Sequence, residues 1–126
     1  MVLFPLLQQI RTTATHDLAQ LRLDREWQLF IQQLEREVNE AEWYAVHNGK
    51  LELGVNNQLV TYERYGNVVR RRVFGEGHII MCQYVRYLTW QPINPQLFRL
   101  EMTLAHQGKE RFRERLLALR TEALSP

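Results

Sequence analysis

The feature that most constrains this chain is the stretch from Leu6 to Val46, which contains no glycine and no proline. Because these two residues disfavour helix interiors most strongly, their absence permits one long helix, or two helices in series. Apolar residues within it recur three or four positions apart, the spacing of one helix face. They are Trp27, Phe30, Ile31, Leu34, Val38 and Ala41. Residues 12–17 form helix least readily, and Asp24 could cap a second helix.

The pattern changes after Trp43. Asn48-Gly49, between Trp43–His47 and Lys50–Val55, is a dipeptide preferred in two-residue hairpin turns. Further turn signals stand at Asn56-Asn57 and at Gly66-Asn67. A turn roughly every ten residues predicts an antiparallel meander.

The last third of the chain also favours strands. Residues 79–90 are apolar and rich in aromatics, and we expect Pro92 and Pro95 to end that run. Residues 97–105 alternate between apolar and polar side chains, and Gln107-Gly108 then favours a hairpin with a final strand to about Leu119. The spacing of Phe112, Leu116, Leu119 and Ala123 also fits a helix, but the short turn favours the strand. The predicted fold class is α+β, with a long N-terminal helix packed on a mainly antiparallel β-sheet.

Composition restricts the chain to one ordinary globular domain. It has 126 residues, of which 45% are hydrophobic and 24% charged, and a single cysteine, Cys82. A lone cysteine excludes an internal disulfide and a cysteine-rich zinc site. Gly75–His78 matches only a fragment of a phosphate loop, and no histidine has a metal-ligand spacing. We therefore predict no cofactor, no metal, no small-molecule substrate and no enzymatic activity.

Charge is unevenly distributed, although the net charge is only +2. Residues 24–42 hold two arginines and six carboxylates, whereas 63–74 and 109–120 each have a surplus of three positive charges. Because strand residues alternate between faces, Arg70 and Arg72 should face one way and Arg71 the other. One interpretation is internal pairing of arginines with carboxylates such as Glu35, Glu37, Glu101 and Glu114.

The other interpretation is a surface for DNA or for a protein partner. Its candidate residues are Arg64, Arg70, Arg72, Arg111, Arg113 and Arg115. Tyr62, Tyr65 and Trp90 could stack on bases, but core and interface positions are the favoured interpretation for these aromatics. A net charge of +2 provides little non-specific attraction for nucleic acid, so internal pairing is the favoured interpretation.

The N-terminus is apolar but short. Its first seven residues cannot cross a bilayer, because a spanning helix needs about 20. The segment either packs on its own domain or is the end of a longer apolar helix. The candidate stem residues, for contact with membrane or partner, are Leu3, Phe4, Leu6, Leu7 and Ile10.

A long helix with an apolar start, followed by an antiparallel sheet, resembles type IV pilins and pseudopilins. Three segments, covering roughly residues 25–90, resemble more closely the ComGF-type minor pilins of Gram-positive competence systems. They are residues 30–35 (FIQQLE), 62–73 (YERYGNVVRRRV) and 75–78 (GEGH). Family members begin with a leader and a full hydrophobic helix, of which only Leu3–Leu7 is present here.

The resemblance implies a structural subunit of a competence pilus, needed for pilus assembly and DNA uptake. Residues 1–23 would be the remnant and continuation of the pilin helix, and residues 24–126 the globular head. The partners would be other competence pilins and minor pilins, with the membrane held through the missing N-terminal helix. The protein would be single-pass with an extracellular head, and at the cell surface after assembly. The alternative is a soluble basic module that binds nucleic acid directly through an arginine-rich sheet face.

Overall fold

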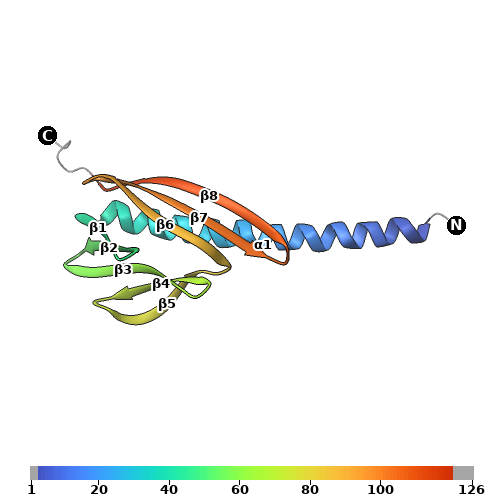
Figure 1. Cartoon of the computed structure of the whole chain (residues 1–126), viewed down its shortest axis with the longest axis horizontal. Coiled ribbons are helices and arrows are strands. Elements are labelled where there is room, and N and C mark those ends of the chain that lie inside the picture. Colours follow the sequence, from blue (N-terminus) through green and yellow to red (C-terminus); the bar gives the residue numbers. More distant parts are fainter. Residues whose placement is uncertain (1–2, 121–126) are drawn as a thin grey trace.

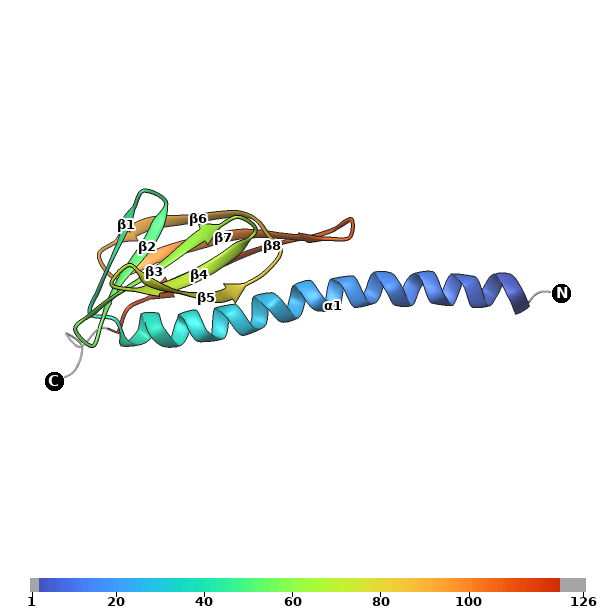
Figure 2. The ribbon, with the colours of Figure 1, turned by 90° about the horizontal axis from the view of Figure 1, so that it is seen from below.

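A single long helix dominates the computed structural model, which describes residues 3–120 and, within them, side chains from Leu18 onward. Helix α1 (Leu3–Glu40) is uninterrupted over 38 residues, or about 57 Å at the usual rise per residue. Its C-terminal half lies against the strands and its N-terminal half projects beyond them (Figures 1 and 2). The predicted long helix is confirmed. No second helix begins at Asp24, which lies within α1.

Eight antiparallel strands follow α1 within residues 3–120, and they form two sheets rather than one. The five-stranded sheet has the order β1-β2-β3-β4-β5, and the three-stranded sheet the order β6-β7-β8. Both are meanders, in which each strand pairs with the next along the chain. The strands are β1 (Trp43–His47), β2 (Lys50–Val55), β3 (Gln58–Tyr65), β4 (Val68–Val73), β5 (Glu76–Cys82), β6 (Val85–Asn94), β7 (Leu97–His106) and β8 (Lys109–Ala118).

The two sheets meet at one pair of edges, and α1 closes the space between the other pair. At the first, the Tyr44 hydroxyl of β1 lies 2.6 Å from the carbonyl oxygen of Asn94 and 2.8 Å from that of Leu97. The Tyr44 ring packs on Phe98, with centroids 4.7 Å apart. At the other side α1 contacts both β5 and β8. Figure 2 shows both sheets on the same side of the helix.

The core lies between the helix and the inner faces of the two sheets. The predicted apolar face of α1 is confirmed, because Trp27, Phe30, Ile31, Leu34 and Val38 are all buried. The buried stripe also extends toward the N-terminus to Leu23 and Ala19. Both sheets contribute fully buried side chains opposite it, among them Leu51, Leu53, Val60, Phe98, Leu100, Met102 and Leu104.

The turn and strand predictions hold in most places. Asn48 and Gly49 both have positive φ angles, of 52° and 72°, as a type I′ turn requires. Strand β7 buries every second residue, and β8 ends at Ala118, one residue before the predicted end of the final strand.

The prediction that Pro92 ends the apolar run is wrong. Strand β6 continues through Pro92 to Asn94. It is an edge strand, and its register shifts beside Pro92, so a residue without an N–H is tolerated there. The break falls instead at Gln83-Tyr84, where Tyr84 has a φ angle of 64° and the chain passes from one sheet to the other.

Replacing Phe30 with alanine should lower the free energy of unfolding by about 3–5 kcal/mol, because it leaves a cavity between α1 and the sheets. Leu18 of the same helix is 61% exposed, so Leu18→Ala is the matched control and should change stability by much less. Urea denaturation followed by circular dichroism measures both. Equal losses for the two variants would show that the assigned core face is wrong.

Candidate functional site

The β3–β4 hairpin separates its arginines onto two faces, as strand alternation predicts. Arg70 lies opposite Glu63 in the register, and Arg71 lies opposite Tyr62. Tyr62 is buried and faces α1, so Arg71 shares the inner face. Arg70 and Arg72 therefore lie on the outer face of the five-stranded sheet together with Glu63.

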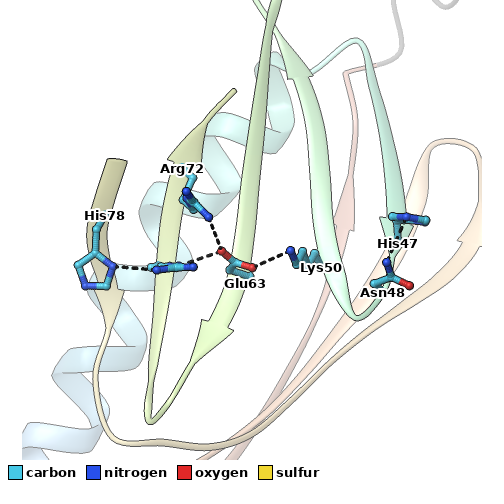
Figure 3. A network of polar contacts seen from close by, with 7 residues as sticks. His47, Asn48, Lys50, Glu63, Arg72 and His78 are labelled. Atoms are coloured by element: carbon cyan, nitrogen blue, oxygen red, sulfur yellow. Dashed lines mark hydrogen bonds and ion pairs between the residues drawn. The ribbon is translucent and has the colours of Figure 1, made fainter. Parts of the chain in front are cut away.

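On the outer face, three cations surround one carboxylate, that of Glu63 (Figure 3). The Glu63 carboxylate lies 3.1 Å from Lys50 Nζ, 2.8 Å from Arg70 Nε and 3.6 Å from an Arg72 guanidinium nitrogen. Glu63 is only 6% exposed. Burial raises the pKa of Glu63, but the hydrogen bonds and charges of Arg70 and Lys50 outweigh it and bring the pKa below its usual value. The cluster keeps two positive charges in excess.

An exposed aromatic completes the outer cluster. The Arg70 guanidinium lies over the Tyr65 ring, 4.0 Å from its centroid, in a cation–π contact. The same ring meets His78 edge-on, with centroids 5.4 Å apart. These contacts fix Arg70 in place and leave only 18% of its side chain exposed. Arg64 is exposed and donates from Nε to the carbonyl oxygen of Gly66.

On the inner face, Arg71 and Tyr62 converge on Glu37 of α1. Arg71 donates two hydrogen bonds of 2.8 Å to the two Glu37 oxygens, and the Tyr62 hydroxyl donates a third. Burial raises the pKa of Glu37, but these hydrogen bonds and the Arg71 charge outweigh it, so the net pKa lies below the usual value. Burial, followed by the neighbouring Glu37, raises the pKa of Tyr62. The ionised Glu37 carboxylate therefore ties α1 to Tyr62 of β3 and Arg71 of β4.

The arginines of β8 also face α1. Arg111 and Arg113 both pair with Asp24, at 3.3 and 3.1 Å, and Arg115 pairs with Glu35. The Arg115 guanidinium also lies 6.0 Å from the Trp27 ring centroid. Asp24 is therefore a partner for the sheet and not the helix cap that the sequence suggested.

The six candidate arginines do not share one surface. Arg70 and Arg72 lie on the outer face of the five-stranded sheet, whereas exposed Arg64 lies opposite buried Val69 and so belongs to the other face. Arg111, Arg113 and Arg115 lie on the α1-facing side of the three-stranded sheet, where helix carboxylates hold them. Sequence reasoning expected Glu35 and Glu37 as partners, and both are.

Two of the four expected carboxylate partners are wrong, and two partners were missed. Within residues 18–120, Glu101 and Glu114 form no ion pair, whereas Asp24 and Glu63 do. Glu63 had a signal in the sequence. Counting outward from the turn at Gly66-Asn67 places it opposite Arg70, as the register shows. Asp24 had none, because its partners are about 90 residues away and reach it only through the fold.

The remaining candidates from the sequence are Cys82, the three aromatics that could stack on bases, and the possible metal ligands. Cys82 is fully buried, and burial raises the pKa of its thiol to about 12, which keeps it protonated. Tyr62 and Trp90 are buried, so of the three candidate stacking aromatics only Tyr65 is exposed. Among residues 18–120, no group of three or more His, Cys, Asp or Glu side chains is placed to hold a metal ion.

The predicted stem residues Leu3, Phe4, Leu6, Leu7 and Ile10 belong to α1, but their side chains lie outside the described part of the chain. No helix among the described residues combines the length and the apolar character needed to cross a membrane.

Comparison with known protein families gives a match over most of the chain. The family model for the competence protein ComGF matches residues 6–110, which is most of the chain. No curated protein and no solved structure matches. The matched segment includes α1 from Leu6 onward and the strands through the β7–β8 turn, so it contains all the ion pairs around Glu63 and Glu37.

Stability should fall as the pH drops below about 4.5, the usual pKa of a glutamate, because Glu37 has a lower pKa when folded. The stability that ionised Glu37 contributes is fully present above that pH, and it is lost as the pH falls through the pKa of Glu37 in the folded protein. Urea denaturation at about pH 6 and pH 3 measures the loss.

Glu37→Gln should reduce that pH dependence, and Glu40→Gln, at an exposed position on the same helix, should leave it unchanged. If both variants lost the same amount of stability between about pH 6 and pH 3, Glu37 would not be the ionised partner of Arg71.

Proposed function

Because the chain belongs to the ComGF family of competence proteins, we propose that it is a minor pilin or pseudopilin of the competence pilus. In this proposal it is a structural, non-catalytic subunit that is needed for pilus assembly and DNA uptake. The observation that carries the proposal is the shape of the molecule. One continuous helix is built into the head by its C-terminal half and projects from it by its N-terminal half (Figure 2).

The proposal assigns different roles to the two parts of the chain. Residues 1–23 continue the pilin helix, and residues 24–126 form the head. Before assembly, the apolar stem around Leu3, Phe4, Leu6, Leu7 and Ile10 leads to a membrane helix, and the head lies outside the cell. After assembly, the protein is at the cell surface, in contact with other competence pilins and minor pilins.

The polar groups of the head support a structural role. Arg71 and the three arginines of β8 are held by carboxylates of α1, where they fix the helix against the sheets. Arg70 and Arg72 are held by Glu63 within the five-stranded sheet. The thiol of Cys82 is buried and protonated at neutral pH, which makes it a poor nucleophile.

Deleting the chain from a transformable host should abolish competence pili and DNA uptake, and the wild-type chain should restore both. Pilus counts by immunofluorescence and transformation frequency measure this. His78→Ala and Cys82→Ala should also restore transformation if the proteins fold, because no reaction depends on either residue. Normal pili and normal transformation in the deletion strain would contradict the proposal.

One observation favours direct nucleic-acid binding as a second candidate. The outer cluster around Glu63 has two excess positive charges, and exposed Arg64 lies at the turn end of the same hairpin, on its other face. Exposed Tyr65 is beside them. A basic patch with an aromatic is a combination that single-stranded nucleic acid can use. The patch is small, because the β8 arginines are directed toward α1 and do not extend it.

We therefore expect weak DNA binding by the full chain. A titration of labelled DNA, duplex and single-stranded, at about 50 mM salt favours electrostatic contacts and should give a Kd above about 1 μM. Submicromolar binding that is lost in Arg64→Glu and Arg72→Gln, but kept in Arg120→Glu, would favour the nucleic-acid candidate instead.

A further inference from the structure

The outer face of the three-stranded sheet presents an unusual stripe on β8. Because Arg111, Arg113 and Arg115 face α1, the alternate residues Phe112, Glu114 and Leu116 face away from it. Phe112 and Leu116 are each 54% exposed, and Glu114 between them is exposed too. The stripe therefore reads apolar, negative, apolar, with about 7 Å between successive members.

Neighbouring strands reinforce this stripe and leave its charge uncompensated. Glu101 of β7 lies directly opposite Glu114, and like charges in that position repel each other. Within residues 18–120 neither carboxylate forms an ion pair, although Arg99 lies two residues along β7. Tyr87 of β6, 47% exposed, lies across Thr103 of β7 from Phe112.

The free side of α1 presents the complementary pattern. Leu21, Arg25 and Leu29 are spaced four residues apart, so they form one ridge on the helix, with about 6 Å between successive members. Leu21 is 61% exposed and Leu29 48% exposed. Arg25 is also exposed, and among residues 18–120 it forms no ion pair. Both sheets lie on one side of α1, so this ridge is open (Figure 2).

We propose that the Leu21–Arg25–Leu29 ridge of one copy docks on the Phe112–Glu114–Leu116 stripe of a second copy. The spacings of about 6 Å and 7 Å agree closely enough for the two leucines to cover Phe112 and Leu116. Arg25 then lies over Glu114 and Glu101, where its guanidinium relieves their repulsion.

The contact has a direct consequence for assembly. It joins two different surfaces of the same chain, so it is a head-to-tail contact, which builds a ring or an open helical filament. The inference rests on the proposed function in this respect, and it adds a contact between two copies to the contacts with other pilins proposed above. Copies joined in this way would stack with the helix of one along the sheet of the next.

Sedimentation equilibrium of the full chain over a wide concentration range tests the contact. Arg25→Glu alone and Glu114→Arg alone should each weaken self-association at least about tenfold, since each places like charges together. An equimolar mixture of the two variants should regain association, because each supplies the surface that complements the other. Circular dichroism checks that both variants fold.

Two controls and two outcomes make the test decisive. Arg36→Glu, three turns further along the same exposed side of α1, and Glu76→Arg, on β5, should associate like the wild type. A chain that stays monomeric at all concentrations would overturn the inference. So would association that both charge reversals leave unchanged, which would place the contact elsewhere on the chain. Neither outcome bears on the pilus and transformation test, so failure of the contact and failure of the proposed function are separable.

Discussion

The structure depends on the burial of one face of α1 against two sheets at once. Neither meander closes on itself, and the sheets meet each other along only one pair of edges. The stripe from Leu23 to Val38 fills the remaining opening between β5 and β8. Full burial of each large apolar side chain contributes about 1.5–3 kcal/mol, so this stripe is the main reason that two small sheets form one body.

Ion pairs on both flanks of this stripe fix how the helix sits. Asp24 and Glu35 lie three turns apart on the side toward β8 and bind its arginines, whereas Glu37 lies on the other side and binds Arg71. The exposed pairs add little to stability. In the partly buried Glu37–Arg71 pair, the cost of removing both charges from water offsets much of their attraction. Their role is specificity, because a helix rotated or shifted by one turn would leave these carboxylates and arginines unpaired.

Much of this arrangement could be predicted from the sequence, and the exceptions have physical reasons. The helix, its core face, the Asn48-Gly49 turn and the final hairpin follow from local periodicity and turn chemistry, which act over a few residues. The division into two sheets could not be predicted, because it depends on a break at Gln83-Tyr84 that contains neither glycine nor proline. The Asp24 pairs with β8 could not be predicted either, because only the tertiary fold brings those segments together.

The proposed function uses this construction directly. A helix that is both the central element of the head and a projecting stem fixes the orientation of one relative to the other, provided that head and helix behave as one body. The family assignment and the projecting helix support this role, and the paired arginines explain why the basic sheet does not form one continuous surface for DNA.

Native-state hydrogen exchange of the full chain tests the central claim most directly. If α1 holds both sheets together, amides of Leu23–Val38, β3 and β7 should open with the same free energy, equal to that of global unfolding. Opening of the helix at a much lower free energy than the strands, or different values for the two sheets, would contradict this account.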